Sequence, residues 1–130
     1  MLENARMITT LPASDLERAK TWYSEKLGLE PKTQDEGFGL VYEAGGLVFS
    51  VYPSEFAGTN KATAAGIELA NFDEVIADLK SKGVTFEEVD FGEMGKTVDG
   101  VIAMPDGSRK GAWIRDSEGN ILGLSTPTDM

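Results

Sequence analysis

The chain repeats one pattern of secondary-structure signals, and this repeat limits the possible folds more than any other feature. A strand-like segment, an amphipathic helix and a terminating glycine occur at residues 7–29 and again at residues 66–84. Setting Asp15 on Asp73 aligns the two copies with an offset of 58 residues (73 − 15). Because duplicated units of this size bury their apolar faces against one another, the repeat predicts two similar modules in one architecture.

Both copies contain a helix whose ends can be recognised. Ser14 and Glu17 have the spacing of a capping box and predict where the first helix begins, and Gly28 predicts where it ends. The second helix is expected between Asn71 and Gly83, with apolar residues at helical spacing.

The remaining segments carry strand and turn signals. The strands are predicted at Met7–Leu11, Phe38–Glu43, Leu47–Tyr52, Ala65–Ala70, Val84–Val89, Gly111–Arg115 and Asn120–Ser125. Asp90–Lys110 is expected to be a long connection in which Val101–Met104 is a candidate short strand. These assignments give two β-α-β-β-β modules at about residues 5–53 and 64–127, joined by a linker at about 54–63, within a single domain of residues 1–130.

Composition excludes several classes of function. Lys and Arg number 12 and Asp and Glu number 22, so the net charge is −10, which disfavours nucleic acid and anionic membranes as partners. No apolar run approaches the ~20 residues that span a bilayer, and the first residues lack the pattern of a signal peptide. The chain has no Cys and no His, which excludes disulfides, thiol chemistry and imidazole catalysis. We therefore expect a cytoplasmic protein.

Three motifs on this duplicated pattern resemble a known superfamily. They are Ala13-Ser-Asp-Leu-Glu-Arg-Ala followed by Leu27-Gly-Leu29, Asn71-Phe-Asp73 followed by Lys82-Gly-Val84, and the turn Asp116-Ser-Glu-Gly-Asn120. In this order the motifs resemble the vicinal oxygen chelate superfamily of glyoxalase I, extradiol dioxygenases, fosfomycin resistance enzymes and bleomycin-binding proteins. The resemblance implies an α+β fold in which two βαβββ modules form a curved mixed β-sheet cup with one helix per module on the outside. It also implies a homodimer.

The resemblance further implies four metal-ligand positions on the strands of the cup. In this sequence they fall on Ile8, Ser50, Gly66 and Gly123. Transition metals are bound by imidazole, thiolate or carboxylate ligands, and none of these four residues supplies one. We therefore expect no metal and no cofactor.

Strand alternation predicts that Thr10, Val48, Tyr52, Glu68, Ile121 and Ser125 share the face of these four positions. Trp113 is added for its place before the Asp116 turn and Tyr42 for its hydroxyl group. The candidate ligand-binding residues are then Ile8, Thr10, Tyr42, Val48, Ser50, Tyr52, Gly66, Glu68, Trp113, Ile121 and Gly123. The set is mostly apolar or small, with Trp113 as an aromatic wall. Trp113 has an equally ordinary interpretation as a core residue, and Glu68 as an exposed strand residue.

Three functions remain after the metal chemistry of the superfamily is set aside. The first is a metal-independent small-molecule binding protein that holds an apolar or planar ligand, cationic in keeping with the charge of the chain, in the cup. The second is a metal-independent isomerase, lyase or hydrolase that uses Glu68, or a Tyr or Ser of the cup, with Glu68 as the candidate catalytic residue. The third is a non-catalytic interaction module whose cup is filled by its own side chains.

Overall fold

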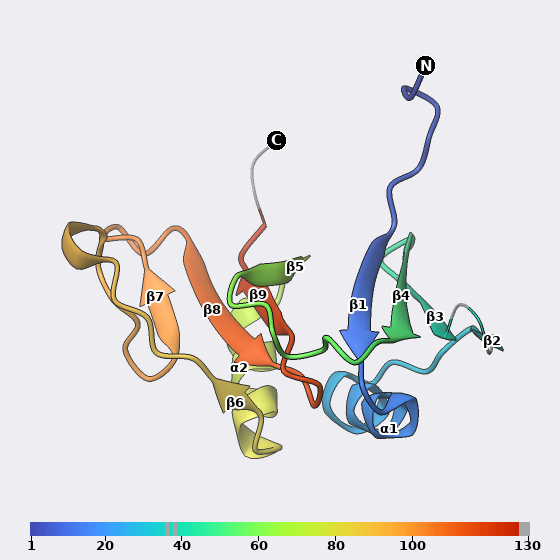
Figure 1. Cartoon of the computed structure of the whole chain (residues 1–130). Helices are drawn as coiled ribbons and strands as arrows, with labels where there is room; N and C mark the ends of the chain where they lie inside the picture. The colour runs from blue at the N-terminus through green and yellow to red at the C-terminus, as the bar shows by residue number, and fades with distance from the viewer. Residues whose placement is uncertain (36, 38, 128–130) are drawn as a thin grey trace.

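The computed structural model describes residues 1–35, 37 and 39–127, and its elements follow the predicted repeat (Figure 1). The first module contains β1 (Thr9–Ala13), α1 (Leu16–Leu27), β2 (Thr33–Asp35), β3 (Gly39–Ala44) and β4 (Leu47–Pro53). The second contains β5 (Thr63–Glu68), α2 (Phe72–Ser81), β6 (Thr85–Phe86), the 3-10 helix η1 (Gly92–Met94), β7 (Val101–Ala103), β8 (Lys110–Arg115) and β9 (Ile121–Ser125).

The two modules use the same sheet topology. The strand order is β1-β4-β3-β2 in the first sheet and β5-β9-β8-β6 in the second, where β7 also pairs with β8. In each sheet the first strand lies at an edge, parallel to the last strand of its module, and the other pairs are antiparallel. The predicted α+β fold of two βαβββ modules is therefore confirmed, with β7 as an addition to the second module.

Each helix covers the apolar face of its own sheet. α1 buries Ala19 and Tyr23, and α2 buries Phe72, Ile76 and Leu79. The sheet residues of the same core alternate along the strands, as a half-buried sheet requires. They are Leu11, Leu40, Tyr42 and Val51 in the first module and Ala112, Ile114, Leu122 and Leu124 in the second.

The helix ends differ in part from the sequence prediction. Gly28 ends α1 in the left-handed conformation (φ 68°), as expected from a residue without Cβ. The N-cap of α1, however, is Asp15, whose carboxylate accepts the Arg18 N–H, and not Ser14. Both residue types cap helices well, and Ser14 contacts the second module instead.

Several strand bounds also differ. β1 is shifted two residues along the chain relative to Met7–Leu11 and includes Pro12, which an edge strand tolerates because one of its N–H positions faces no partner. β6 is shorter than Val84–Val89, because the Val89 N–H bonds to the Thr97 hydroxyl rather than to a neighbouring strand. β2 completes the βαβββ pattern of the first module, although the sequence assigned no residues to this strand. The predicted start of the next strand at Phe38 lies outside the described residues.

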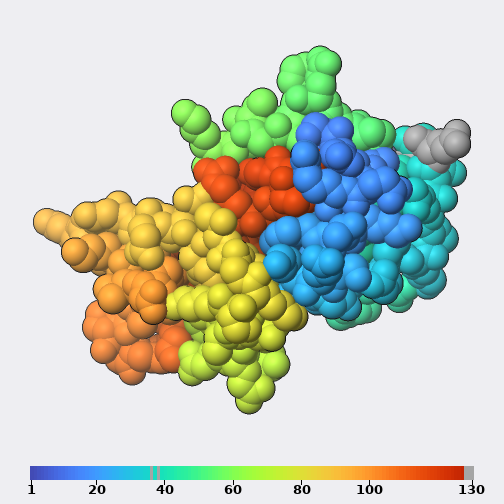
Figure 2. All heavy atoms as spheres, turned by 90° about the horizontal axis from the view of Figure 1, so that it is seen from below, coloured from blue at the N-terminus to red at the C-terminus, as the bar shows by residue number. Residues whose placement is uncertain are grey.

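A buried turn of the second module joins it to the first. Tyr23 of α1 donates its hydroxyl to the Asp116 carboxylate at 2.7 Å, and burial next to that carboxylate raises the pKa of Tyr23. The Asn120 amide donates to the Pro12 carbonyl at 2.9 Å and to Asp116 at 2.9 Å. Viewed from below, the red C-terminal atoms of the second module lie against the blue atoms of the first (Figure 2).

Glu118, in the same turn, adds a charged contact. Its side chain is fully buried and accepts from Arg18 Nε at 2.8 Å, from Arg18 Nη2 at 3.0 Å and from the Asp15 N–H at 3.0 Å. Burial alone would raise the pKa of Glu118, but the hydrogen bonds from Arg18, Asp15 and Ser117 outweigh it and lower the pKa to about 2. The turn Asp116–Asn120 therefore serves as the connection between the modules. Among the helices of the described residues, none is long and apolar enough to cross a membrane.

The lowered pKa of Glu118 predicts a specific loss of stability in acid. A carboxyl group that titrates at 4.5 when unfolded and at about 2 when folded contributes fully above pH 4.5, and its contribution disappears as the pH falls towards 2. Glu118→Gln should therefore lower the free energy of unfolding by on the order of 3 kcal/mol at pH 7, and by much less at pH 2.5. Urea denaturation at both pH values measures this, with the exposed Glu17→Gln as control. Equal losses at the two pH values would contradict the assignment.

Candidate functional site

The predicted cup residues fall on one face of each sheet. In the first sheet Thr10 lies opposite Ser50, and Val48 and Tyr52 alternate onto the same side, while Ile8 comes directly before β1. The face is open, since Ile8 is 43% exposed and Tyr52 37%. It is the face turned away from α1.

The second sheet presents the other half of the set. Gly66 of β5 lies opposite Gly123 of β9, which lies opposite Trp113 of β8. Glu68 and Ile121 alternate onto the same side as these three residues. The predicted positions therefore form two half-faces, one on each module.

Tyr42 does not belong to either half-face, and its inclusion among the candidate ligand-binding residues is corrected here. It pairs with Phe49 on the side of the first sheet that packs on α1, and it is completely buried. Its ring stacks on Phe49 at 4.9 Å, and burial raises its pKa to about 12. Alternation from Val41, which shares the face of Ser50, gives this orientation.

The most clearly formed part of the predicted face surrounds Trp113. A Cβ at Gly123 would lie 3.6 Å from Trp113 Nε1 and 3.2 Å from the Thr63 methyl carbon, so the indole occupies the space beside this glycine. Phe91, from the loop that precedes η1, packs on the indole with ring centroids 5.5 Å apart. A Cβ at Gly66 would meet no atom within 4 Å, which leaves open space next to the aromatic pair.

The four positions that the resemblance assigns to a metal do not fit one. Ile8, Ser50, Gly66 and Gly123 together offer one hydroxyl group, whereas divalent transition metals want nitrogen, sulfur or carboxylate ligands. Over residues 1–35, 37 and 39–127, no three Asp or Glu side chains are grouped so that they could hold an ion.

Glu68 lies on the predicted face but is exposed to solvent. Its role as the candidate catalytic residue stays a prediction.

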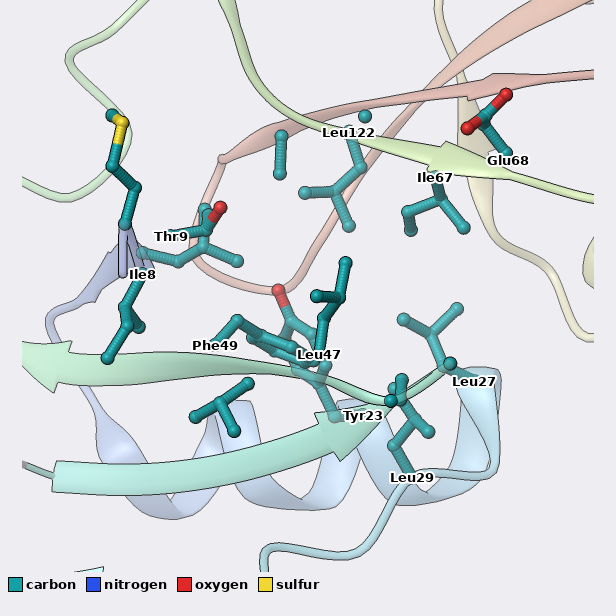
Figure 3. Close-up of a pocket in the computed structure, with 18 of the residues that line it drawn as sticks. Ile8, Thr9, Tyr23, Leu27, Leu29, Leu47, Phe49, Ile67, Glu68 and Leu122 are labelled. Carbon is teal, nitrogen blue, oxygen red and sulfur yellow. The ribbon is translucent and has the colours of Figure 1, made fainter. Parts of the chain in front are cut away.

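A cavity of about 510 Å³ lies between the modules, on the opposite side of both sheets (Figure 3). Ile67 and Leu122 of the second module point across it toward Leu47 and Phe49 of the first, whereas Glu68 points away. The helix-facing sides of the two sheets therefore turn toward each other, and the predicted half-faces turn away from the cavity.

Sequence reasoning identified only the margin of this cavity. Of the predicted residues, Ile8, Val48, Gly66 and Glu68 contribute to its lining. The others in the lining were not singled out: Arg6, Met7, Thr9, Leu11, Tyr23, Leu27, Leu29, Ala44, Gly45, Gly46, Leu47, Phe49, Ala65, Ile67 and Leu122. The helical stripe and the strand alternation do place Leu11, Tyr23 and Leu122 on apolar faces, but such faces are expected to be filled.

Comparisons with known proteins agree on the fold. The sequence model of the Glyoxalase/Bleomycin resistance protein/Dioxygenase superfamily matches residues 7–124. A bleomycin resistance determinant encoded on the transposon Tn5 is similar in structure, with a TM-score of 0.69 and 19% identity over 98% of this chain and 100% of the other. Lactoylglutathione lyase from Agrobacterium tumefaciens is also similar, with a TM-score of 0.68 and 18% identity over 97% of this chain and 96% of the other.

A third similar structure is a mutant of the genomically encoded fosfomycin resistance protein FosX from Listeria monocytogenes, in complex with Mn(II) and 1S,2S-dihydroxypropylphosphonic acid. Its TM-score is 0.68, with 15% identity over 97% of this chain and 92% of that chain. None of the curated proteins matches this sequence. At these identities the structural likeness establishes the fold alone.

The packing around Gly123 predicts unequal effects of one substitution at two neighbouring glycines. Gly123→Val should shift the neighbouring Thr63 and Trp113 side chains and lower the free energy of unfolding by about 1–3 kcal/mol, because a Cβ would already lie 3.2 Å from Thr63 and 3.6 Å from the indole, and two further methyl groups extend beyond it. Gly66→Val is the control, because a Cβ at Gly66 would meet no atom within 4 Å. It should change neither the position of the Trp113 indole nor the free energy of unfolding. Fluorescence in a Trp22→Phe background reports Trp113 alone. Identical spectra for the two variants would disprove the described contact.

Proposed function

The chain belongs to the glyoxalase/bleomycin resistance protein/dioxygenase superfamily, and on this basis we propose that it is a metal-independent small-molecule binding protein. The observation that carries the proposal is the aromatic pair Trp113 and Phe91 beside Gly66 and Gly123. Aromatic rings next to open backbone are suited to hold a flat molecule by stacking. The indole lies beside Gly123, one of the four positions at which the resemblance would expect a metal ligand.

The ligand class follows from the shape and charge of this surface. Glycines leave a flat floor, and the indole supplies a wall of apolar area. The net charge of −10 and the exposed carboxylate of Glu68 on the same face favour a cation over an anion. We therefore assign the site to planar, mainly apolar molecules, with cationic examples preferred.

The donor chemistry separates this chain from a metal-dependent relative. The FosX structure holds Mn(II), and that ion needs oxygen or nitrogen ligands that Ile8, Gly66 and Gly123 do not provide. The bleomycin resistance determinant supports the binding interpretation by its name, at 19% identity. The enzymatic alternative that uses Glu68 gains no support, because this side chain is exposed.

A homodimer forms part of the proposal. The two half-faces turn away from each other in the single chain, so a ligand that contacts both needs a second copy. Apolar side chains of the first half-face are exposed beside the free edge of β1, among them Ile8 (43%) and Tyr52 (37%), and such edges and patches are commonly covered by association. The cytoplasmic location stays a prediction of the sequence.

The proposal predicts that planar cations stabilise the protein and that Trp113 carries the effect. In a thermal-shift assay with acridine dyes and with metal-free bleomycin, at least one compound should raise the melting temperature, because a ligand of the native state adds to its stability. Trp113→Ala should weaken binding about tenfold, which corresponds to the loss of one aromatic stacking contact. Trp22→Ala, on α1, is the control. If no compound shifts the melting temperature, or if Trp113→Ala binds as the wild type does, the proposed site is wrong.

Native mass spectrometry tests the metal and assembly statements together. After incubation with Zn²⁺ or Mn²⁺ and buffer exchange, we expect a mass of twice the 14.0 kDa chain without a stoichiometric metal. One ion per chain would refute metal independence. A mass of a single chain at micromolar concentration would refute the dimer and leave the Trp113 half-face to act alone.

A further inference from the structure

The cavity between the modules has the form of a binding site. Its floor is made of Leu11, Tyr23 and Leu122, which are 1–2% exposed, while Met7 and Leu47 at its mouth are 99% and 75% exposed. A recessed floor below an open mouth makes a concave site, and about 510 Å³ lies in the range of small-molecule pockets.

The walls are aliphatic rather than aromatic. Leu27, Leu29 and Ile67 line the sides together with Leu47, and the aromatic ring of Phe49 already has one stacking partner in Tyr42, at 4.9 Å. Walls of this kind gain affinity from apolar area and shape, and not from stacking.

Among the described residues, no side-chain polar group at the floor of the cavity is available to hydrogen-bond to a ligand. The Tyr23 hydroxyl is bonded to Asp116 at 2.7 Å and cannot donate to a ligand. Arg6 and Glu68, the charged residues of the lining, are both exposed to solvent, and the Glu68 carboxylate points away from the cavity. Thr9 adds a hydroxyl. A charged group buried at the floor would have no compensation, which selects against ionised ligands.

We propose that this cavity is a second ligand site, for an uncharged aliphatic molecule such as a long-chain alcohol or a terpenoid. The hydrocarbon part of the ligand lies between the modules, and its polar end lies near Thr9 at the mouth of the cavity. The site differs from the Trp113 half-face, which lies on the other side of the second sheet, and the two regions meet at Gly66 and Glu68 of β5. One side of the sheet therefore takes flat molecules and the other side takes flexible aliphatic ones.

A second copy of the chain is the competing occupant, since Met7 and Leu47 are exposed at the mouth. The small molecule is favoured because the floor is recessed behind partly buried walls, which an opposing surface covers but does not fill. The two occupants give different results in the following experiment.

The test is isothermal titration calorimetry with straight-chain alcohols of increasing length. Affinity should rise about fourfold per added methylene group until the cavity is full, because each group is moved from water into an apolar site. Ile67→Glu, which places a charge in the wall, should weaken binding by at least tenfold. Ile102→Glu, the same change on β7 away from the cavity, should alter binding less than twofold.

Circular dichroism and native mass spectrometry of the same samples separate folding and association from binding. Folded Ile67→Glu that binds the alcohols as the wild type does would overturn the proposal. Absence of alcohol binding to the wild type would also overturn it, and if Ile67→Glu then converts a dimer into single chains, the cavity is an interface between copies. If Ile67→Glu fails to fold, the more conservative Ile67→Thr replaces it, with at least a fourfold loss expected and unchanged binding as the opposing result.

Discussion

The arrangement of the molecule depends on one buried turn, Asp116–Asn120, through which the second module holds the first. Asp116 accepts from Tyr23, and Glu118 accepts from Arg18 and the start of α1. No ladder joins the two sheets within the described residues, so the polar contacts of this turn and the shared apolar core hold the modules together. The polar contacts are directional, unlike apolar packing, and therefore favour one angle between the sheets. Two carboxylates thus position both candidate sites without belonging to either.

The repeat and the strand alternation were sufficient for the fold and for most orientations. Asp15 and Asp73 aligned two modules that share one topology, and alternation put Ser50, Gly123 and Trp113 on the faces away from the helices. The inclusion of Tyr42 among the ligand-binding candidates was wrong. It was chosen for its hydroxyl group, although alternation from its neighbour Val41 places the Tyr42 side chain on the side of the sheet that faces α1. Ser14 was wrong as the cap because residue preference does not distinguish adjacent capping residues, and a distant partner, Glu118, decides between them.

The cavity could not be predicted in the same way, for a physical reason. Leu11, Phe49 and Ile67 belong to regular apolar faces. Periodicity predicts that such a face is covered, but it does not predict which part of the molecule covers it. Whether helix, second module or empty space covers it depends on the angle between the modules. That angle comes from contacts some 100 residues apart in the chain, between Arg18 and Glu118 or Tyr23 and Asp116, to which no local pattern is sensitive.

The proposed surface for flat molecules depends on space as well as on the absence of metal ligands. At position 123 a Cβ would lie 3.2 Å from the Thr63 methyl carbon and 3.6 Å from the indole of Trp113, so any longer side chain would compete with these two neighbours for room. The glycine at this position lets the indole lie beside the strand and pack on Phe91. At Gly66 a Cβ would meet no atom within 4 Å, so the open part of the proposed surface begins there.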